Sequence, residues 1–192
     1  YANLSNAKLD NINAVSKGLH ASFSYANFTK ASLRNARLDG VDMQNANCFK
    51  ADFTGAVLER SDLYKIKGRH AIFNQTNLRQ SRATNADFSH AHLRNANLTS
   101  TFMEQVLFNS ADMRGVDFSM SKAYSCDFSG ALLQGANLSN TNINQSNFEG
   151  ADITGGNFNH MNPFKARFDA KWKDYLKKQD LYDQYETIIW IH

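Results

Sequence analysis

The chain has 192 residues with 21 basic and 18 acidic side chains, so its net charge is only +3. A hydrophobic content of 42% is sufficient for a buried core and excludes a disordered chain. No apolar run approaches the roughly 18 residues that are needed to span a bilayer. The two cysteines, Cys48 and Cys126, are too few for a disulfide framework or a zinc site, and they fit a reducing compartment.

A five-residue repeat dominates the chain. At its start, Ala2-Asn3-Leu4 and Ala7-Lys8-Leu9 carry the motif one residue out of phase with the later repeats. From Phe23 to Phe168, thirty consecutive positions spaced five apart keep one phase, and most hold a large apolar residue. A smaller residue, usually Ala, stands two positions before each of them, with Asn or Asp usually in between. A period of five fits neither an α-helix nor an alternating strand, so the chain must turn after every short extended segment.

The large and small apolar positions lie two residues apart, so both side chains point inward from one extended segment. The polar residue between them points outward. With this pattern, A(D/N)LxX, the chain resembles the pentapeptide-repeat family over residues 1–168. The resemblance implies an all-β solenoid, a right-handed quadrilateral β-helix in which four pentapeptides form one coil. About eight coils are then expected, stacked at about 4.8 Å.

Stacked positions should recur at every fourth pentapeptide in such a coil. One column then reads Phe28, Cys48, Gly68, Phe88, Phe108, Phe128, Phe148, Phe168, and another is almost entirely leucine. Gly68 leaves a hole in the phenylalanine column, whereas Ile66 fills a position that is usually small. Two interpretations stay open: a large-for-small exchange within a coil that keeps its register, or an outward bulge of residues 67–70.

After residue 168 the five-residue period ends. Residues 169–192 place apolar side chains on one broad helical stripe, with Asp169 as a candidate N-cap. The stripe consists of Trp172, Tyr175, Leu176, Tyr182, Tyr185 and Ile189. We expect a C-terminal α-helical cap over the end of the solenoid, and the resemblance also allows a homodimer through it. Residues 187–191 are rich enough in β-branched side chains to form a strand instead. The predicted domains are the β-helix, 1–168, and the capping helix or tail, 169–192.

The sequence contains no motif for catalysis. A nucleophile elbow, a phosphate loop, paired carboxylates and metal-ligand spacings are absent beyond what the repeat itself generates. We therefore expect no enzyme, no cofactor and no metal. His70 and His90 are four pentapeptides apart and should stack at one corner below Lys50, but a metal would need further ligands. Cys48 and Cys126 fall at inward positions, as small core residues do.

Several outward positions carry apolar residues where Asn or Asp is expected, namely Ile72, Phe102, Leu107 and Leu132. Phe102 is placed on one face near outward aromatic residues, and exposed apolar patches commonly mark a partner site. The candidate partner-binding residues are Tyr64, Phe102, Leu107, Tyr124 and Phe164. The alternative is contact with a domain that lies outside this sequence.

A second candidate surface is basic. Residues 1–168 carry 17 basic and 13 acidic side chains, a net charge of +4. The candidate basic patch consists of Arg60, Lys65, Lys67, Arg69, His70, Arg79 and Arg82. Family members that bind DNA gyrase or topoisomerase look like B-form DNA, which carries about one negative charge per 1.7 Å. A mildly basic rod argues against such mimicry. Weak nucleic-acid binding through the patch stays open, although the modest net charge disfavours it.

The leading interpretation is a non-enzymatic protein–protein interaction module or scaffold, a rigid rod that presents side chains to another protein. The resemblance fits a domain of a larger bacterial protein or secreted effector, and the start at Tyr1 fits a truncated chain. The sequence has no transmembrane segment; a cytoplasmic location is expected, with secretion or host delivery left open. The fold does not identify the partner.

Overall fold

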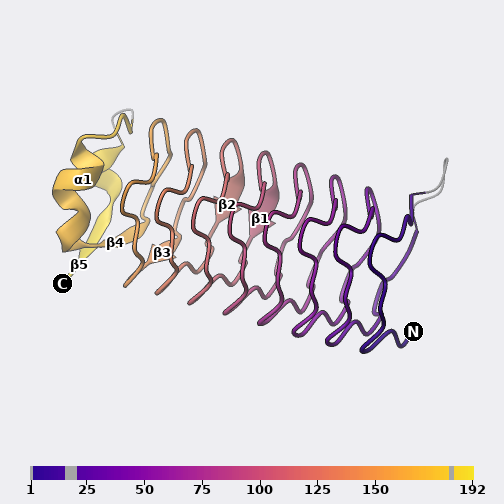
Figure 1. The fold of residues 1–192 in the computed structure, drawn as a ribbon. Coiled ribbons are helices and arrows are strands. Elements are labelled where there is room, and N and C mark those ends of the chain that lie inside the picture. Colours follow the sequence, from indigo (N-terminus) through magenta and orange to yellow (C-terminus); the bar gives the residue numbers. More distant parts are fainter. Residues whose placement is uncertain (1, 16–20, 182–183) are drawn as a thin grey trace.

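The computed structural model describes residues 2–15, 21–181 and 184–192. The chain winds into a β-helix, with coils stacked along a rod and the two termini at opposite ends (Figure 1). Parallel bridges join every fourth pentapeptide on four sides of each coil. One such set is Asn27↔Asn47, Ser32↔Asp52, Arg37↔Val57 and Asp42↔Asp62. The predicted interval between stacked positions is confirmed.

The four sides of the rod can be named by their outward bridge residues, taken at every fourth pentapeptide. Side 1 carries residues 22 to 162 and side 2 carries residues 27 to 167. Side 3 carries residues 32 to 152 and side 4 carries residues 37 to 157. A two-residue corner separates each side from the next.

The first coil accounts for the phase shift at the start of the chain. Its bridges are Asn3↔Asn27, Lys8↔Ser32 and Asn13↔Arg37, so each pair is further apart in sequence than the pairs of later coils. The four additional residues fall between Ala14 and Ala21, a stretch that lies partly outside the described residues. The apolar residues of the first repeats therefore occupy the same inward columns as those of the later repeats.

The corners explain why the chain turns every five residues. The last residue of each pentapeptide, from Tyr25 to Lys165, has a positive φ between 52° and 70°. Most corners also close with a backbone hydrogen bond, such as Ala26 N to Phe23 O at 2.9 Å. These are the features of a type II turn. Glycine and asparagine enter this region with little strain, which explains why they recur at these corners.

Most rungs of the β-helix are single bridges, and only a few are longer strands. The strands in the described residues are β1 (Phe102–Glu104), β2 (Lys122–Tyr124), β3 (Asn147–Phe148), β4 (Arg167–Asp169) and β5 (Ile189–Ile191). β1 pairs with β2, and β3, β4 and β5 form a parallel sheet in that order.

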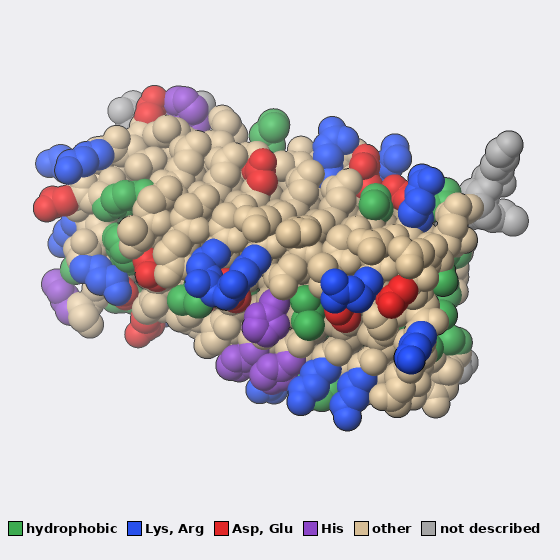
Figure 2. Space-filling view, viewed as in Figure 1, with side chains coloured by type: hydrophobic (Ala, Val, Ile, Leu, Met, Phe, Trp, Pro, Cys, Tyr) green, Lys and Arg blue, Asp and Glu red, His purple; other side chains and the backbone are tan. Residues whose placement is uncertain are grey.

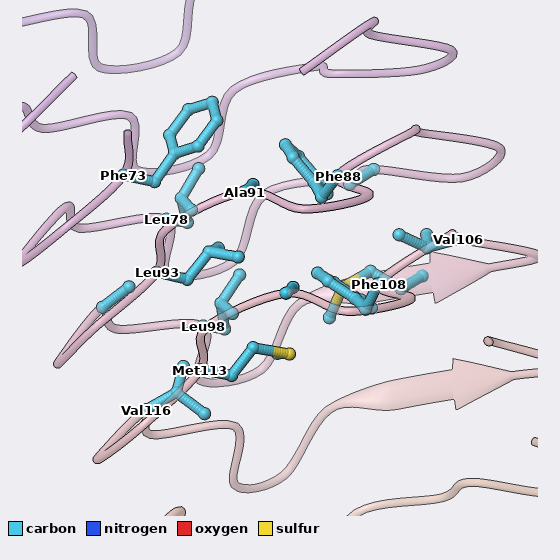
Figure 3. Packing of buried hydrophobic residues seen from close by; sticks show 14 of the residues in the cluster. Phe73, Leu78, Phe88, Ala91, Leu93, Leu98, Val106, Phe108, Met113 and Val116 are labelled. Atoms are coloured by element: carbon cyan, nitrogen blue, oxygen red, sulfur yellow. The ribbon is translucent and has the colours of Figure 1, made fainter. Parts of the chain in front are cut away.

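The inward columns fill the interior of the rod. Phenylalanine rings of side 2 stack from coil to coil, with centroids 5.1 Å apart for Phe108 and Phe128 and 4.6 Å apart for Phe128 and Phe148. Figure 3 shows Phe88 and Phe108 on successive coils, with Leu93 and Met113 in the same interior. Side 1 uses Ser and Thr at many small inward positions, and most of these hydroxyls are bonded. Ser61 Oγ, for example, donates to Leu38 O at 2.9 Å.

The hole at Gly68 lies in a coil that keeps its register. Lys67 bridges both of its neighbours at the usual interval, and the Gly68 carbonyl accepts the corner hydrogen bond from Ala71 N at 3.0 Å. The outward bulge is therefore wrong. A Cβ atom at Gly68 would lie 2.8 Å from Phe88 Cδ1, so the ring of the next coil occupies that space. With Ile66 also buried, the large-for-small exchange describes this coil.

The C-terminal segment is not the single long helix that its apolar stripe predicts. It consists of η1 (Ala170–Trp172), α1 (Lys173–Lys177), η2 (Tyr185–Thr187) and β5. Ile189 belongs to β5, as the strand alternative predicts, and Tyr182 lies outside the described residues. The Asp169 carboxylate caps neither helix; it accepts a hydrogen bond from Gly150 N at 3.1 Å.

The same segment lies over the end of the last coil (Figure 1). Trp172 Nε1 donates to Ala151 O at 3.1 Å, and the Tyr175 hydroxyl donates to Gly156 O at 2.5 Å. Gln179 Oε1 accepts from Phe158 N at 3.0 Å. These contacts satisfy backbone groups that the next coil would otherwise bond. None of the helices in the described part of the chain is long and apolar enough to cross a membrane.

The contact between Gly68 and Phe88 gives a test of the packing. Gly68→Ala should lower the free energy of unfolding by about 1–3 kcal/mol, because the added methyl group displaces the Phe88 ring from a packed position. Urea unfolding measures the loss. In the double variant with Phe88→Leu, the clash is relieved, so the combined loss should be smaller than the sum of the two single losses. Strictly additive losses would show that the ring is not the obstacle.

The two cysteines give a chemical test of the core. Burial raises the pKa of the Cys126 thiol to about 12 and also raises the pKa of Cys48. Because only the thiolate attacks a disulfide reagent, neither thiol should react in the folded protein near pH 8. A chromogenic disulfide reagent should detect both thiols after unfolding in denaturant. Rapid reaction of either thiol before unfolding would contradict this placement.

Candidate protein-binding surface

The outward residue of most pentapeptides has a structural role. Where it is Asn or Asp, its side-chain oxygen usually accepts a hydrogen bond from the backbone N–H two residues later, at the corner. Asp62 accepts from Tyr64 N at 3.0 Å, and Asp127 accepts from Ser129 N at 3.0 Å. Asn and Asp are short enough to bond their own backbone in this way. This interaction explains why the motif prefers them at an outward position.

Five outward positions have an apolar side chain in place of this acceptor: Val57, Ile72, Phe102, Leu107 and Leu132. Phe102 is 38% exposed and Leu107 is 42% exposed, so burial in the core does not account for them. A hydrocarbon cannot accept the corner N–H, so each position forgoes a hydrogen bond worth about 1 kcal/mol. A residue that is both exposed and less favourable than Asn for the fold indicates a role outside the fold.

Phe102 belongs to an apolar group near the middle of side 1. It lies on β1 and pairs with Lys122 of β2. Met120 precedes β2 at the corner and is 62% exposed, whereas Tyr124 ends β2 at the opposite corner and is partly buried. Adjacent rungs are about 4.8 Å apart, so the three side chains surround Lys122 on two neighbouring coils. We call Phe102, Met120 and Tyr124 the side-1 cluster.

The corner that holds Tyr124 is one of a few without the usual backbone hydrogen bond. The usual hydrogen bond from residue 126 to residue 123 is replaced by the hydroxyl of Ser146 in the next coil. Cys126 N donates to Ser146 Oγ at 3.0 Å, and Ser146 Oγ donates to Ala123 O at 2.8 Å. The hydroxyl therefore bridges the two ends of the corner, and the backbone through Tyr124 stays extended as β2.

The other predicted partner-binding residues lie apart from the side-1 cluster. Leu107 is one corner away, on side 2, where it bridges Asp87 and Asp127. Tyr64 and Phe164 share the corner column of Tyr124, but they lie three and two coils from it, about 14 and 10 Å along the rod. Cations cover both rings: Arg82 Cζ lies 5.5 Å from the Tyr64 centroid, and Lys165 Nζ lies 5.2 Å from that of Phe164.

Met120 is the member of the side-1 cluster that the repeat pattern does not single out. It occupies the left-handed corner position, with φ 59°. The signal in the sequence is a large apolar residue at a position where Gly and Asn are the easiest to accommodate. The sequence pattern is weak there, because the corner places almost no restriction on side-chain size.

The predicted basic patch extends around part of the rod instead of forming a flat surface. Arg60 and Arg79 lie at the corner between sides 4 and 1, where both form ion pairs with Glu59, at 3.8 and 3.3 Å. The other members follow the chain around two sides. Arg82 lies on side 1, Lys65 at the next corner, Lys67 on side 2, and Arg69 and His70 at the corner between sides 2 and 3.

His70 and His90 stack as their spacing predicts, with centroids 5.0 Å apart and ring planes 12° apart. Phe49 meets His70 edge-on at 5.8 Å. Burial and the neighbouring His90 imidazole lower the pKa of His70. Within the described ranges, no group of three or more His, Cys, Asp or Glu side chains is arranged to hold a metal ion.

The family model for pentapeptide repeats matches this chain in eight copies, over residues 21–60, 69–99, 86–122 and 124–159. Among solved structures, a trypsin-treated variant of QnrB1, a plasmid-mediated fluoroquinolone resistance protein, is similar with a TM-score of 0.64 and 13% identity. The similarity covers 96% of this chain and 90% of that one. No curated protein gives a significant match.

A second solved structure is that of HetL, a pentapeptide-repeat protein involved in heterocyst differentiation regulation from the cyanobacterium Nostoc sp. strain PCC 7120. It is 22% identical over 86% of this chain and 88% of its own, with a TM-score of 0.44. At such low identities the comparison with QnrB1 supports the β-helix fold alone. The five-residue repeat, the coil of four pentapeptides and the match to the family model together show that this chain belongs to the pentapeptide-repeat family.

Proposed function

We propose that this protein is a non-enzymatic binding module whose β-helix presents the side-1 cluster to a partner protein. The observation that carries the proposal is that Phe102 stands at an outward position where the repeat usually has Asn or Asp. An exposed aromatic ring replaces the side chain that would hold its corner, so the position is occupied at some cost to the fold. Such a local departure from the structural rule is expected at a functional position.

The composition of the cluster fits the centre of a protein interface. Phe102 and Tyr124 supply aromatic area, and Met120 adds a flexible apolar side chain that can adapt to a partner. Lys122 and Glu104 are exposed beside them and supply charge around the apolar centre. Interfaces commonly combine an apolar centre with a polar rim.

The β-helix also holds the cluster in place before any partner binds. Phe102 N donates to Ser81 O at 3.0 Å, and Phe102 O accepts from Ala83 N at 2.9 Å. On the other side, β1 pairs with β2 over three residues. Because the backbone is already ordered, binding loses less conformational entropy than it would on a mobile loop.

Mimicry of duplex DNA is the weaker alternative, because residues 1–168 carry a net charge of +4. A relative in fold, QnrB1, is described as a fluoroquinolone resistance protein, so a gyrase supercoiling assay separates the two functions. The proposed binding module should leave supercoiling unchanged.

Some expectations from the sequence stay predictions. They are the right-handed winding, the count of about eight coils, the C-terminal segment as a cap or dimer contact, and the cytoplasmic location.

Affinity capture tests the proposed surface. Wild-type protein should retain a partner from a lysate of the source cells that a Phe102→Asn/Met120→Asn variant loses by about tenfold or more. Quantitative mass spectrometry of the bound fraction measures the loss. Leu132→Asn on side 3 is the matched control, since it changes an equally exposed residue at the same repeat position. If both variants retain the same proteins in the same amounts, side 1 is not the binding surface.

The loss of folding stability that Phe102 causes, compared with Asn at the same position, can be measured without a partner. Phe102→Asn and Leu107→Asn should each raise the free energy of unfolding by up to about 1 kcal/mol, because Asn can accept the corner N–H of residue 104 or 109. Thermal unfolding measures the change. Asp127→Ala removes such an acceptor and should lower stability by a similar amount. A loss of stability in Phe102→Asn would show that the ring serves the fold, and the main support for side 1 would disappear.

A further inference from the structure

A ridge of cations and imidazoles runs along the corner between sides 2 and 3. Its members, Lys30, Lys50, His70 and His90, are the left-handed residues of four consecutive coils, with φ of 57–58°. They extend over about 15 Å at the usual strand spacing. Figure 2 shows histidine side chains next to Lys and Arg along one edge of the face in view. We call these four residues the cationic ridge; it lies on a different surface from the side-1 cluster.

The fold does not require these residues. The same corner column continues as Ser110, Gly130 and Gly150 in the later coils. Glycine meets the left-handed conformation without strain, whereas a residue with a Cβ atom is less favourable there. Four Lys or His residues in succession therefore concentrate charge at a place where the backbone does not require it.

The ridge brings positively charged and protonatable groups together. Besides His90, the groups whose charge lowers the pKa of His70 are Arg69, Lys50 and His92. His92 lies on side 3 beside the ridge, and Arg69 immediately precedes His70 at the corner. The centroids of the two stacked imidazoles are only 5.0 Å apart, so a charge on His90 disfavours protonation of His70.

The nearest carboxylates on the flanking sides already have partners. On side 3, Asp52 forms an ion pair with Arg34 at 2.9 Å. On side 2, Asp87 accepts a hydrogen bond from the backbone N–H of Ser89 at 2.9 Å. Among the described residues, Lys30, Lys50 and Arg69 form no ion pair. In the described part of the chain, these three cations therefore have no carboxylate in direct contact with them.

We propose that the cationic ridge binds an acidic segment of a polypeptide, whose carboxylates pair with Lys50, Arg69 and the two stacked imidazoles. Charge complementarity determines the sign of the ligand. Lys50 and Arg69 are exposed at this corner. His70 lies on the same coil as Arg69, between Lys50 and His90 in the corner column, so one extended ligand can reach all four residues.

The surroundings of the ridge favour a polypeptide over a nucleic acid. Ile72, one of the apolar outward residues, lies on side 3 between Asp52 and His92. Phe49, partly exposed, has Lys50 Nζ 5.2 Å from its ring centroid. A bound peptide that has an apolar side chain next to its acidic residues can contact Ile72 and Phe49 in addition to the cations.

Binding at the ridge should depend on pH in a defined direction. In the free protein the pKa of His70 is below its ordinary value, so the imidazole is largely neutral at neutral pH. A bound carboxylate favours the protonated form and raises that pKa, so binding takes up a proton. Affinity must then increase as the pH falls through the histidine range. Glutamate side chains stay ionised over the same range, because their pKa is about 4.3.

Fluorescence anisotropy with a labelled oligo-glutamate peptide tests the proposal. The intact protein should bind this peptide, and not oligo-glutamine, about threefold to tenfold more tightly near pH 6 than near pH 8. Added salt should weaken the binding. His70→Asn/His90→Asn should abolish the pH dependence and keep the backbone conformation, because Asn tolerates a positive φ.

Lys50→Asn should weaken binding about threefold to tenfold at both pH values. Lys165→Asn is its matched control, since it removes the same charge at the same repeat position on another corner; it should bind as wild type does. Absence of oligo-glutamate binding, pH dependence that survives in His70→Asn/His90→Asn, or an equal loss in Lys165→Asn would each overturn the proposal. Tighter binding of a DNA oligonucleotide of equal charge would assign the ridge to nucleic acid instead.

Discussion

The left-handed residue that ends each pentapeptide is the constraint on which the rest of the structure depends. It turns the chain at every corner, and its N–H also bonds to the corner of the next coil, as Lys65 N does to Thr84 O at 3.0 Å. One backbone conformation therefore closes each coil and joins it to its neighbour. Because this function belongs to the backbone, the corner side chains are free to vary, and the surface can change without altering the interior.

The outward residues have less freedom than the corners. Asn and Asp at these positions hold the following N–H, so most of them serve the fold although they are exposed. Phe102 and the cationic ridge depart from the local preference in two different ways. Phe102 gives up a hydrogen bond, whereas Lys50 and His70 place charge in a corner column that ends in glycine, at Gly130 and Gly150. Both departures become visible only once the structural role of each repeat position is known.

The sequence predicts the interior of the rod well, because its period is long, regular and tied to side-chain size. The stacking of His70 on His90 follows from the same interval of four pentapeptides. The C-terminal segment could not be predicted in this way. Its aromatic stripe fits a helix, but the end of the last coil offers backbone groups that Trp172 and Tyr175 bond instead. Only tertiary contact decides between these arrangements.

The surface is harder to predict than the interior for a geometric reason. Each pentapeptide advances the chain by one side, so basic residues close together in the sequence are distributed around the rod, as Arg60 and His70 are. Residues four pentapeptides apart are neighbours instead, and a run of charge in the sequence does not reveal them. Met120 could not be predicted because its corner position accepts almost any residue, so a methionine there does not disturb the repeat.

The interval between stacked residues also governs how such a protein can change its length. Loss or gain of a whole coil of four pentapeptides shortens or extends the rod and leaves every later residue on its own side. Loss of a single pentapeptide keeps the core pattern but rotates every later residue onto a neighbouring side. Surface columns such as the one through Lys30 and Lys50 would then be broken at that point. Evolution can therefore alter this surface either one residue at a time or in units of a complete coil, but seldom by steps in between.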